Sequence, residues 1–465
     1  MRFFITLVFC AISFFGIAGN VTIKGHAKGF ENATISLLEM KEAVSERLGV
    51  LAKAQVNAQG EFYFNIQVDK LTHAVLRCNW QNAPFWIRPN TMYEVVFPKS
   101  TDALISINNK AKVPLVFKKL DKDDPNIIAA KLNTALDKEM DFLFESTTTG
   151  RFKGAFSTFE KSIQAEMLKV PATPFAQNKT KYALGGIEAE IRVNKKKIFD
   201  KYLAENTDFP IWEPDFAHFF KAFFKDYLGV FEDYRDGQPI LTAMMGQIPV
   251  YRFLELLEKD DFLKDPKLRE MVAIWGVFDS GRVRKWDGLL VSSYLEKFVA
   301  AAKYPETKVL AQHLSEKWAQ SHRGGKIEGV HGYFAKGEKM ELDPGAKDLT
   351  LYCFGISSVD AVIEDLIILR DLSLRFSQQL AIQYISLDKD LDTFRKFSKD
   401  YYKIGIPLTH YNHNEDLMDR LGLISVPSYI LVNKDGRKLL DYCPRPSEGL
   451  DLVISETIIR QSRRE

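Results

Sequence analysis

Apolar and polar residues alternate along the first hundred residues of the chain. In "EFYFNI" the apolar side chains of Phe62, Phe64 and Ile66 stand two positions apart, the period of a β-strand with one buried face. Similar runs recur up to about residue 97, separated by turn sequences such as "NAQG". This pattern predicts a small antiparallel β-sandwich.

The period changes near Pro125. Asp124 can cap free helix amides, and proline fits the first helical position. Apolar residues then recur at helical spacing, at Ile128, Leu132, Leu136, Met140 and Leu143. Further segments of the same kind continue to about residue 322. The middle of the chain is therefore predicted to be an all-α section.

A third pattern begins at Leu349. "LTLYCF" reads as a buried strand, "VDAVIEDLIILRDLSLRF" as an amphipathic helix and "LAIQYISLD" as a second strand. This order predicts a right-handed crossover between parallel strands. Two further helices are predicted at "KDLDTFRKFSKDYY" and "EDLMDRLGL". After them, "SYILVN" and "RKLLDY" predict a closing antiparallel hairpin. The fold class is thus multidomain, with an N-terminal antiparallel β-sandwich, a central all-α section and a C-terminal α/β domain.

The first 18 residues have the pattern of a secretory signal. Arg2 precedes an apolar run over residues 3–15, and small residues follow it. The run is shorter than the roughly 20 residues of a spanning helix. We therefore expect cleavage near Gly19, export to the periplasm or cell envelope, and no stable membrane span afterwards.

Cysteine content and net charge argue against a disulfide framework and give no reason to expect nucleic-acid binding. Cys78, Cys353 and Cys443 remain after cleavage, an odd number without close spacing, so no disulfide framework is expected. The formal net charge of +2 gives no general reason to expect nucleic acid as a partner. The basic run at residues 195–197 is predicted to be a solvated helix face.

An aromatic cluster in the helical section allows two interpretations. Its side chains stand three or four positions apart, so they could line a ligand groove or fill a core that faces other helices. The core is the expected use. The cluster consists of Phe216, Phe219, Phe220, Phe223, Phe224, Tyr227 and Phe231.

Three motifs near the C-terminus carry a family resemblance. "GYFAKGEKMELDPGAKDLTLYCF", "ISLDKDLDTFRKF" and "RLGLISVPSYILVNKDGRKLL" make the segment from about Gly332 onward resemble the thioredoxin-like fold of the TlpA/ResA type, the exported thiol-disulfide oxidoreductases. The resemblance implies that Pro427 follows a cis peptide bond. It also implies that the backbone of Val426, Pro427 and Ser428 forms a lip that pairs with a peptide or mixed-disulfide partner.

The β-rich part carries a second resemblance. "VTIKGHAKGFENATISLLE", "VNAQGEFYFNI" and "FWIRPNTMYEVVF" resemble the N-terminal domain of unknown function found in many exported Bacteroidetes thioredoxin-like proteins. The expected organisation is a signal peptide at 1–18, a β-sandwich at 19–118, a helical domain at 119–325 and a thioredoxin-like domain at 326–465.

The chain departs from the family at the turn that should carry Cys-x-x-Cys. That motif falls on residues 357–360 or, one position earlier, on 356–359, and neither register contains sulfur. Disulfide exchange needs a thiolate, which a serine hydroxyl cannot supply near neutral pH. The turn is therefore predicted to be redox-inactive and to hold no catalytic residue. Its residues are Ile356, Ser357, Ser358, Val359 and Asp360.

The remaining cysteines offer little redox chemistry. Cys353 lies within a predicted strand, where a free cysteine behaves as a small apolar residue. Cys443 follows the closing hairpin, and a bridge between the two is expected to have to span the sheet. Cys78 is most simply a strand residue.

Two further possibilities are metal binding by histidines and nucleophilic catalysis by a serine. His410 and His413 could bind a metal if they lay on a helix, but they precede one, so no metal site is expected and Asn414 is interpreted as the helix cap. Ser357 lacks the sequence context of a nucleophile elbow, and a serine at a helix start is more typically a cap.

The expected function follows from the geometry that remains. Ser357, Ser358 and Asp360 stand at a helix start beside Pro427, where free amides and an exposed backbone edge can hold an extended peptide. Asp360 makes the site less attractive to anions. We predict a peptide- or protein-binding module of the cell envelope with no cofactor and an unknown partner. Thiol-disulfide oxidoreductase activity and a structural role in an envelope assembly are the alternatives.

Overall fold

Two compact units account for the described chain. Unit 1 comprises residues 1–40, 48–103 and 111–180, and unit 2 comprises 41–47, 104–110 and 181–465. The predicted boundaries at 118 and 325 stay predictions. The computed structural model describes residues 19–79, 81–100, 111–148, 152–191, 194–204, 208–234, 240–284, 286–327, 329–388, 391–411, 421, 423, 425–440 and 442–462.

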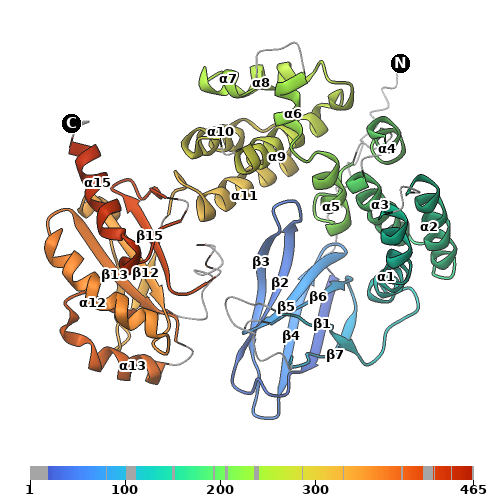
Figure 1. The fold of residues 1–465 in the computed structure, drawn as a ribbon. Coiled ribbons are helices and arrows are strands. Elements are labelled where there is room, and N and C mark those ends of the chain that lie inside the picture. The colour runs from blue at the N-terminus through green and yellow to red at the C-terminus, as the bar shows by residue number, and fades with distance from the viewer. Residues whose placement is uncertain are drawn as a thin grey trace, which may run out of the picture. The chain divides into compact units, whose positions relative to one another are not determined.

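Two β-sheets form the first part of unit 1 (Figure 1). Their strand orders are β4-β1-β7-β9 and β3-β2-β5-β6-β8. Most neighbours are antiparallel, as predicted, but β1 runs parallel to β7 and β6 parallel to β8. The chain between the partners is long enough for a parallel pairing, since five strands separate β1 from β7 and one strand separates β6 from β8. The strands are β1 Gly19–His26, β2 Thr34–Glu42, β3 Arg47–Gln55, β4 Glu61–Val68, β5 Thr72–Cys78, β6 Gln81–Ile87, β7 Met92–Val96, β8 Ala111–Lys112 and β9 Val116–Phe117.

The two sheets share one apolar core. Phe62 and Phe64, which the alternation predicted to face inward, are buried there with Cys78. Burial raises the pKa of the Cys78 thiol from its ordinary value of 9.0 to about 12, because the core disfavours the charged thiolate. Cys78 is thus a strand residue of the core, as expected.

The buried Cys78 thiol predicts a pH dependence of stability. Below pH 9 the thiol is protonated in both states; between pH 9 and 12 it ionises only in the unfolded chain, so the free energy of unfolding falls. We expect a loss on the order of 4 kcal/mol over this window, since each pKa unit corresponds to about 1.4 kcal/mol. Urea unfolding of wild type and Cys78→Ala across the window measures it. An equally steep loss in Cys78→Ala would assign the dependence to other groups.

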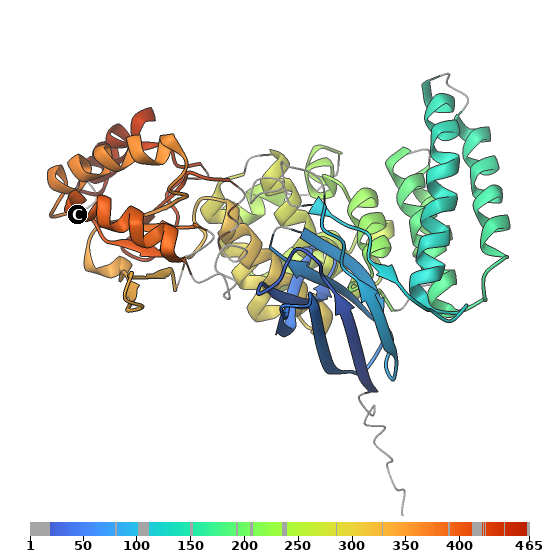
Figure 2. The same cartoon turned by 90° about the horizontal axis from the view of Figure 1, so that it is seen from below.

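Helices complete unit 1. α1 (Pro125–Thr148) and α2 (Phe152–Met167) lie side by side, as Figures 1 and 2 show. α3 (Pro174–Ile191) follows and passes into unit 2 at residue 181. The predicted start at Pro125 is confirmed. Asp124 Oδ1 accepts the main-chain N–H of Asn126 at 2.8 Å, and the Asn126 side chain bonds both main-chain groups of Trp86, at 2.7 and 2.8 Å. This amide anchors α1 to β6.

The helical part of unit 2 surrounds the predicted aromatic core. All seven members of the aromatic cluster are buried, so the core interpretation is confirmed. Lys195, within the basic run, places its ammonium over the ring of Tyr227, 4.9 Å from the centroid, so this residue covers the core as well as facing water. The helices are α4 Lys195–Tyr202, α5 Pro214–Phe223, α6 Tyr227–Tyr234, α7 Ile240–Met245, α8 Val250–Leu257, α9 Pro266–Arg284, α10 Gly288–Ala301 and α11 Pro305–Ser321.

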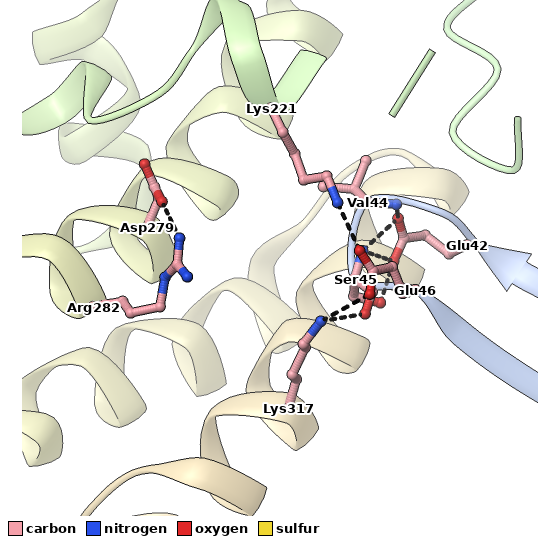
Figure 3. Close-up of polar contacts among 8 residues, drawn as sticks. All are labelled: Glu42, Val44, Ser45, Glu46, Lys221, Asp279, Arg282 and Lys317. Carbon is pink, nitrogen blue, oxygen red and sulfur yellow. Dashed lines mark hydrogen bonds and ion pairs between the residues drawn. The ribbon is translucent and has the colours of Figure 1, made fainter. Parts of the chain in front are cut away.

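The turn between β2 and β3, residues 41–47, belongs to unit 2 although most of both strands belongs to unit 1. Its residues Ala43, Val44 and Ser45 are buried. Lys317 Nζ donates to the main-chain oxygen of Ser45 at 2.8 Å, and Lys221 Nζ pairs with Glu46 at 2.9 Å (Figure 3). The turn therefore packs as a plug among the helices, and we call it the hairpin plug.

Glu42 organises the hairpin plug from within. Its carboxylate is fully buried and accepts the N–H groups of Val44 and Ser45 and the Ser45 hydroxyl. His313 of α11 lies 3.8 Å from the carboxylate. Because one side chain satisfies several donors inside the protein, the turn can be buried without leaving its amides unpaired.

A six-stranded sheet follows in the order β11-β10-β14-β13-β12-β15. β12 runs parallel to β13, as predicted for the strand-helix-strand unit. β14, which was not predicted, runs parallel to β13, and β15 is antiparallel to β12. α12, α13 and α15 contribute to one core with the sheet. The elements are β10 His331–Tyr333, β11 Lys339–Glu341, β12 Leu349–Gly355, α12 Asp360–Arg375, β13 Leu380–Ser386, α13 Leu391–Asp400, β14 Leu408–His410, β15 Ser428–Asn433 and α15 Leu450–Ser462.

The closing hairpin is shorter than predicted. "RKLLDY" does not form a full strand: Leu439 N–H donates to the Leu431 oxygen at 3.0 Å, and Val432 makes an isolated antiparallel bridge to Lys438. The predicted helix after β14 falls largely on residues 412–420, outside the described residues.

Candidate functional site

The turn that corresponds to the Cys-x-x-Cys position joins β12 to α12. Val359 is the N-cap of α12, with extended backbone and no side-chain cap. The prediction that a serine caps this helix is therefore wrong. Ser357 instead donates both its main-chain N–H and its hydroxyl to Asp388 Oδ1, at 3.0 and 2.8 Å. Asp360 lies in the first helical turn, where it favours the helix dipole as expected.

Asp388 connects this turn to the end of β13. Its carboxyl group is buried, and its second oxygen accepts the Ser386 hydroxyl at 2.6 Å. Ser386 Oγ also accepts the main-chain N–H of Asp388 at 3.1 Å. Sequence reasoning did not single out Asp388 as a site residue, although the strand ending in "SLD" was the signal. The Asp388 carboxylate thus holds Ser357 and Ser386 in one hydrogen-bond network.

His410 lies on the other side of Asp388. Its Nε2 is 2.9 Å from the main-chain oxygen of Asp388, and its ring stacks on Phe394 with centroids 5.3 Å apart. The imidazole of His410 is therefore not the partner of the Ser357 hydroxyl, which instead donates to the Asp388 carboxylate. His413 and Asn414 lie outside the described residues.

Metal binding finds no support in the described ranges. No three His, Cys, Asp or Glu side chains there are grouped so that they could hold a metal ion. His410 is buried and engaged with the main chain.

The predicted lip lies beside the turn. The antiparallel register pairs Phe354 with Ser428, which brings Pro427 alongside the last residue of β12. The Val426–Pro427 peptide bond is cis, as the resemblance implied. Val426 precedes β15, and its main-chain N–H and C=O make no main-chain hydrogen bond with any residue that the structure describes. The structure thus places the turn and the predicted lip side by side, while Cys353 and Cys443 lie in the core.

Cys353 and Cys443 belong to the core of this region. Both are buried and free and both belong to the core cluster on one face of the sheet. The prediction that a bridge would have to span the sheet is therefore wrong, because the hairpin returns Cys443 to the face on which Cys353 points. Burial raises the pKa of Cys443 to about 12 and that of Cys353 well above its ordinary value. Neither thiol ionises near neutral pH.

Burial of all three thiols predicts chemical inertness. With iodoacetamide at pH 8, we expect no alkylation of Cys78, Cys353 or Cys443 in the native protein within an hour, because the thiolate is the nucleophile and each thiol is inaccessible. In guanidinium chloride all three should react fully. Peptide mapping by mass spectrometry measures both states, and rapid native labelling of Cys353 would contradict the structure.

A buried acid lies beneath the turn. Asp365 of α12 is fully buried, and its Oδ2 accepts Tyr429 Oη at 2.7 Å and Arg445 Nε at 2.9 Å. Burial raises the pKa of the Tyr429 hydroxyl, so the phenol stays protonated and donates to the carboxylate. Sequence reasoning missed this network, because Arg445 follows Asp365 by 80 positions.

No helix among the described residues combines the length and apolar character needed to cross a membrane.

No family model and no curated protein matches the chain. Solved structures do. The thioredoxin domain of a thiol-disulfide oxidoreductase from Bacteroides vulgatus is 16% identical, with a TM-score of 0.26, and covers 29% of this chain and 96% of its own. A thiol:disulfide interchange protein from Bacteroides sp. is 16% identical, with a TM-score of 0.26 and coverages of 29% and 88%.

An uncharacterized thioredoxin-like protein from Bacteroides vulgatus is 19% identical, with a TM-score of 0.25, and the match covers 30% of this chain and 90% of that one. These similarities concern less than a third of the chain. The parallel pair β12–β13 and the antiparallel β15 are the pairings that the sequence predicted for the strand-helix-strand unit and the closing hairpin.

Proposed function

We propose that this chain is an exported thioredoxin-like protein of the cell envelope that binds an extended peptide or a partner protein at the lip formed by Val426, Pro427 and Ser428, without exchanging disulfides. The observation that carries the proposal is the difference between Ser357 and Val426, two neighbouring parts of one site. Ser357 stands in the turn and is held by Asp388, whereas the main-chain groups of Val426 beside it make no main-chain hydrogen bond with the described residues.

Recognition would use the main chain of the ligand. An extended peptide that lies along the lip can pair with Val426 in the manner of an added strand, which gives affinity without a specific side-chain code. Asp360 stands at the neighbouring helix start. Its charge favours a neutral or basic residue at that end of the peptide and disfavours an acidic one.

The oxidoreductase alternative has a weaker chemical basis. Exchange requires a reachable thiolate, and Cys353 is buried with a raised pKa. An insulin-reduction assay on wild type and Cys353→Ser tests this alternative. We expect no turnover above background from either protein, and turnover that the substitution abolishes would replace our proposal by the oxidoreductase reading.

Peptide binding is tested with the insulin B chain, reduced and alkylated so that it offers no disulfide and labelled for fluorescence anisotropy. Val426→Pro removes the main-chain N–H at the lip, and Val426→Ala is the matched control that keeps it. We expect Val426→Pro to weaken binding about tenfold, as loss of a buried main-chain hydrogen bond does, and Val426→Ala to bind as wild type does. Equal affinities of the two variants would rule out use of the lip.

The structural alternative treats the domain as a packing module of an envelope assembly. Pull-down from a periplasmic extract with wild type and Val426→Pro separates it from peptide recognition. Partners recovered equally by both proteins, together with no binding of the B chain, would favour the structural alternative.

A further inference from the structure

A surface groove lies between α8 and α10 in the helical part of unit 2. Its volume of about 490 Å³ falls in the range of small-molecule sites, roughly 300–1,000 Å³. One wall consists of Pro249, Val250, Tyr251 and Leu254, and the other includes two alanines at the end of α10, Ala300 and Ala301. The small alanine side chains leave open the space that larger residues would fill.

The groove walls are apolar and only partly covered by the protein itself. The Tyr251 ring is 56% exposed although it stands beside the half-buried Leu254. An aromatic ring and an aliphatic side chain that line a concave surface gain free energy when a hydrocarbon group displaces water from them. The groove thus suits a short apolar chain or ring.

Two lysines border these walls. Lys297 Nζ lies 2.8 Å from Gln247 Oε1 and 4.3 Å from the centroid of the Tyr294 ring. Lys303 follows α10, and its main-chain N–H is fixed by Glu270 Oε1 at 3.0 Å. Within the part of the chain that the structure describes, neither ammonium group has a carboxylate within 4.0 Å. Both positive charges are available to a ligand.

We infer that this groove binds a small amphiphilic monocarboxylate, with its hydrocarbon part between Tyr251 and Ala300 and its carboxylate between Lys297 and Lys303. The positive charges complement one negative headgroup. A more highly charged anion is disfavoured, because α10 ends at Ala301 and its terminal carbonyl groups contribute partial negative charge there. The site is independent of the lip at Pro427.

Octanoate and octanol are the probes, because they share a chain and differ in charge. Isothermal titration calorimetry on the whole protein should show saturable binding of one octanoate with a Kd below about 1 mM, and octanol about tenfold weaker. The double variant Lys297→Gln/Lys303→Gln should bind octanoate about tenfold more weakly while its affinity for octanol stays within twofold. Lys308→Gln, at an exposed lysine outside the groove, is the matched control and should bind as wild type does.

Ala300→Trp tests the groove itself, since the indole would occupy the space of the hydrocarbon. Ala300 is exposed, so the fold should persist, which circular dichroism checks; Tyr251→Ser provides a second, smaller change at the opposite wall. Both variants should lose most binding of both probes. Unchanged binding in these two variants, equal affinity of octanoate and octanol for wild type, or no saturable octanoate binding up to 5 mM, about fivefold above the expected limit, would each overturn the inference.

Discussion

Arg445→Met should lower the free energy of unfolding of the region built on the six-stranded sheet by about 2–4 kcal/mol. The Arg445 guanidinium donates to Asp365 Oδ2 at 2.9 Å, and the Asp365 side chain is 1% exposed. Removing the cation leaves a carboxylate in the core whose remaining hydrogen-bond partner among the described residues is the Tyr429 hydroxyl. The Arg445 side chain is itself 26% exposed, so water screens part of the interaction and the loss stays below that of a fully buried pair.

The double variant Asp365→Asn/Arg445→Met is the control for this explanation. Without the carboxylate there is no uncompensated charge, so most of the lost stability should return. Urea unfolding that follows Tyr and Trp fluorescence measures both variants. A double variant that is less stable than Arg445→Met would show that the two residues act separately, and the charge argument would then be wrong.

Glu42→Ala should cost about 3 kcal/mol in the unfolding of unit 2, through a different mechanism. The substitution removes the acceptor of the Val44 and Ser45 N–H groups and of the Ser45 hydroxyl, all within a buried turn. Each donor left without a partner costs about 1–3 kcal/mol. Glu42→Gln keeps one oxygen as an acceptor and should lose about half as much.

Glu46→Ala is the matched control for Glu42→Ala, because it lies in the same turn and its side chain is 63% exposed. Its pairs with Lys221 and Lys317 lie at the surface, where an ion pair contributes less than about 1 kcal/mol. Thermal and urea unfolding of the variants provides the comparison. Equal losses at positions 42 and 46 would mean that the hairpin plug is held by its surface pairs.

The sequence predicted those features that depend on local pattern. The alternation around Phe62, the helix start at Pro125 and the strand-helix-strand order after Leu349 follow from periods of two or 3.6 residues, and the structure contains each of them. The place of Pro427 beside the turn followed from a motif that is contiguous in sequence.

Features that depend on distant partners could not be predicted. Asp365 is one polar position on an amphipathic helix, and nothing in its own segment indicates that Arg445 reaches it. Ser357 was expected to cap α12 because serine does so locally, but Asp388 competes for its hydroxyl from the end of the next strand. No prediction was made for the hairpin plug, because nothing in its own residues indicates that helices far along the chain bury it.

The hairpin plug also has a consequence for the order of folding. The hydrogen bond between Lys317 Nζ and the Ser45 oxygen joins residues that are 272 positions apart in the sequence. Helical regions are usually rich in local contacts, so this long-range contact is one that should form late in folding. Because the β2–β3 turn is synthesised first, it cannot be buried until the chain has been made as far as α11. A fragment cut at residue 119 would therefore expose a hollow lined by Lys221, His313 and Lys317, and such a fragment should be rescued in trans by a peptide spanning residues 41–47.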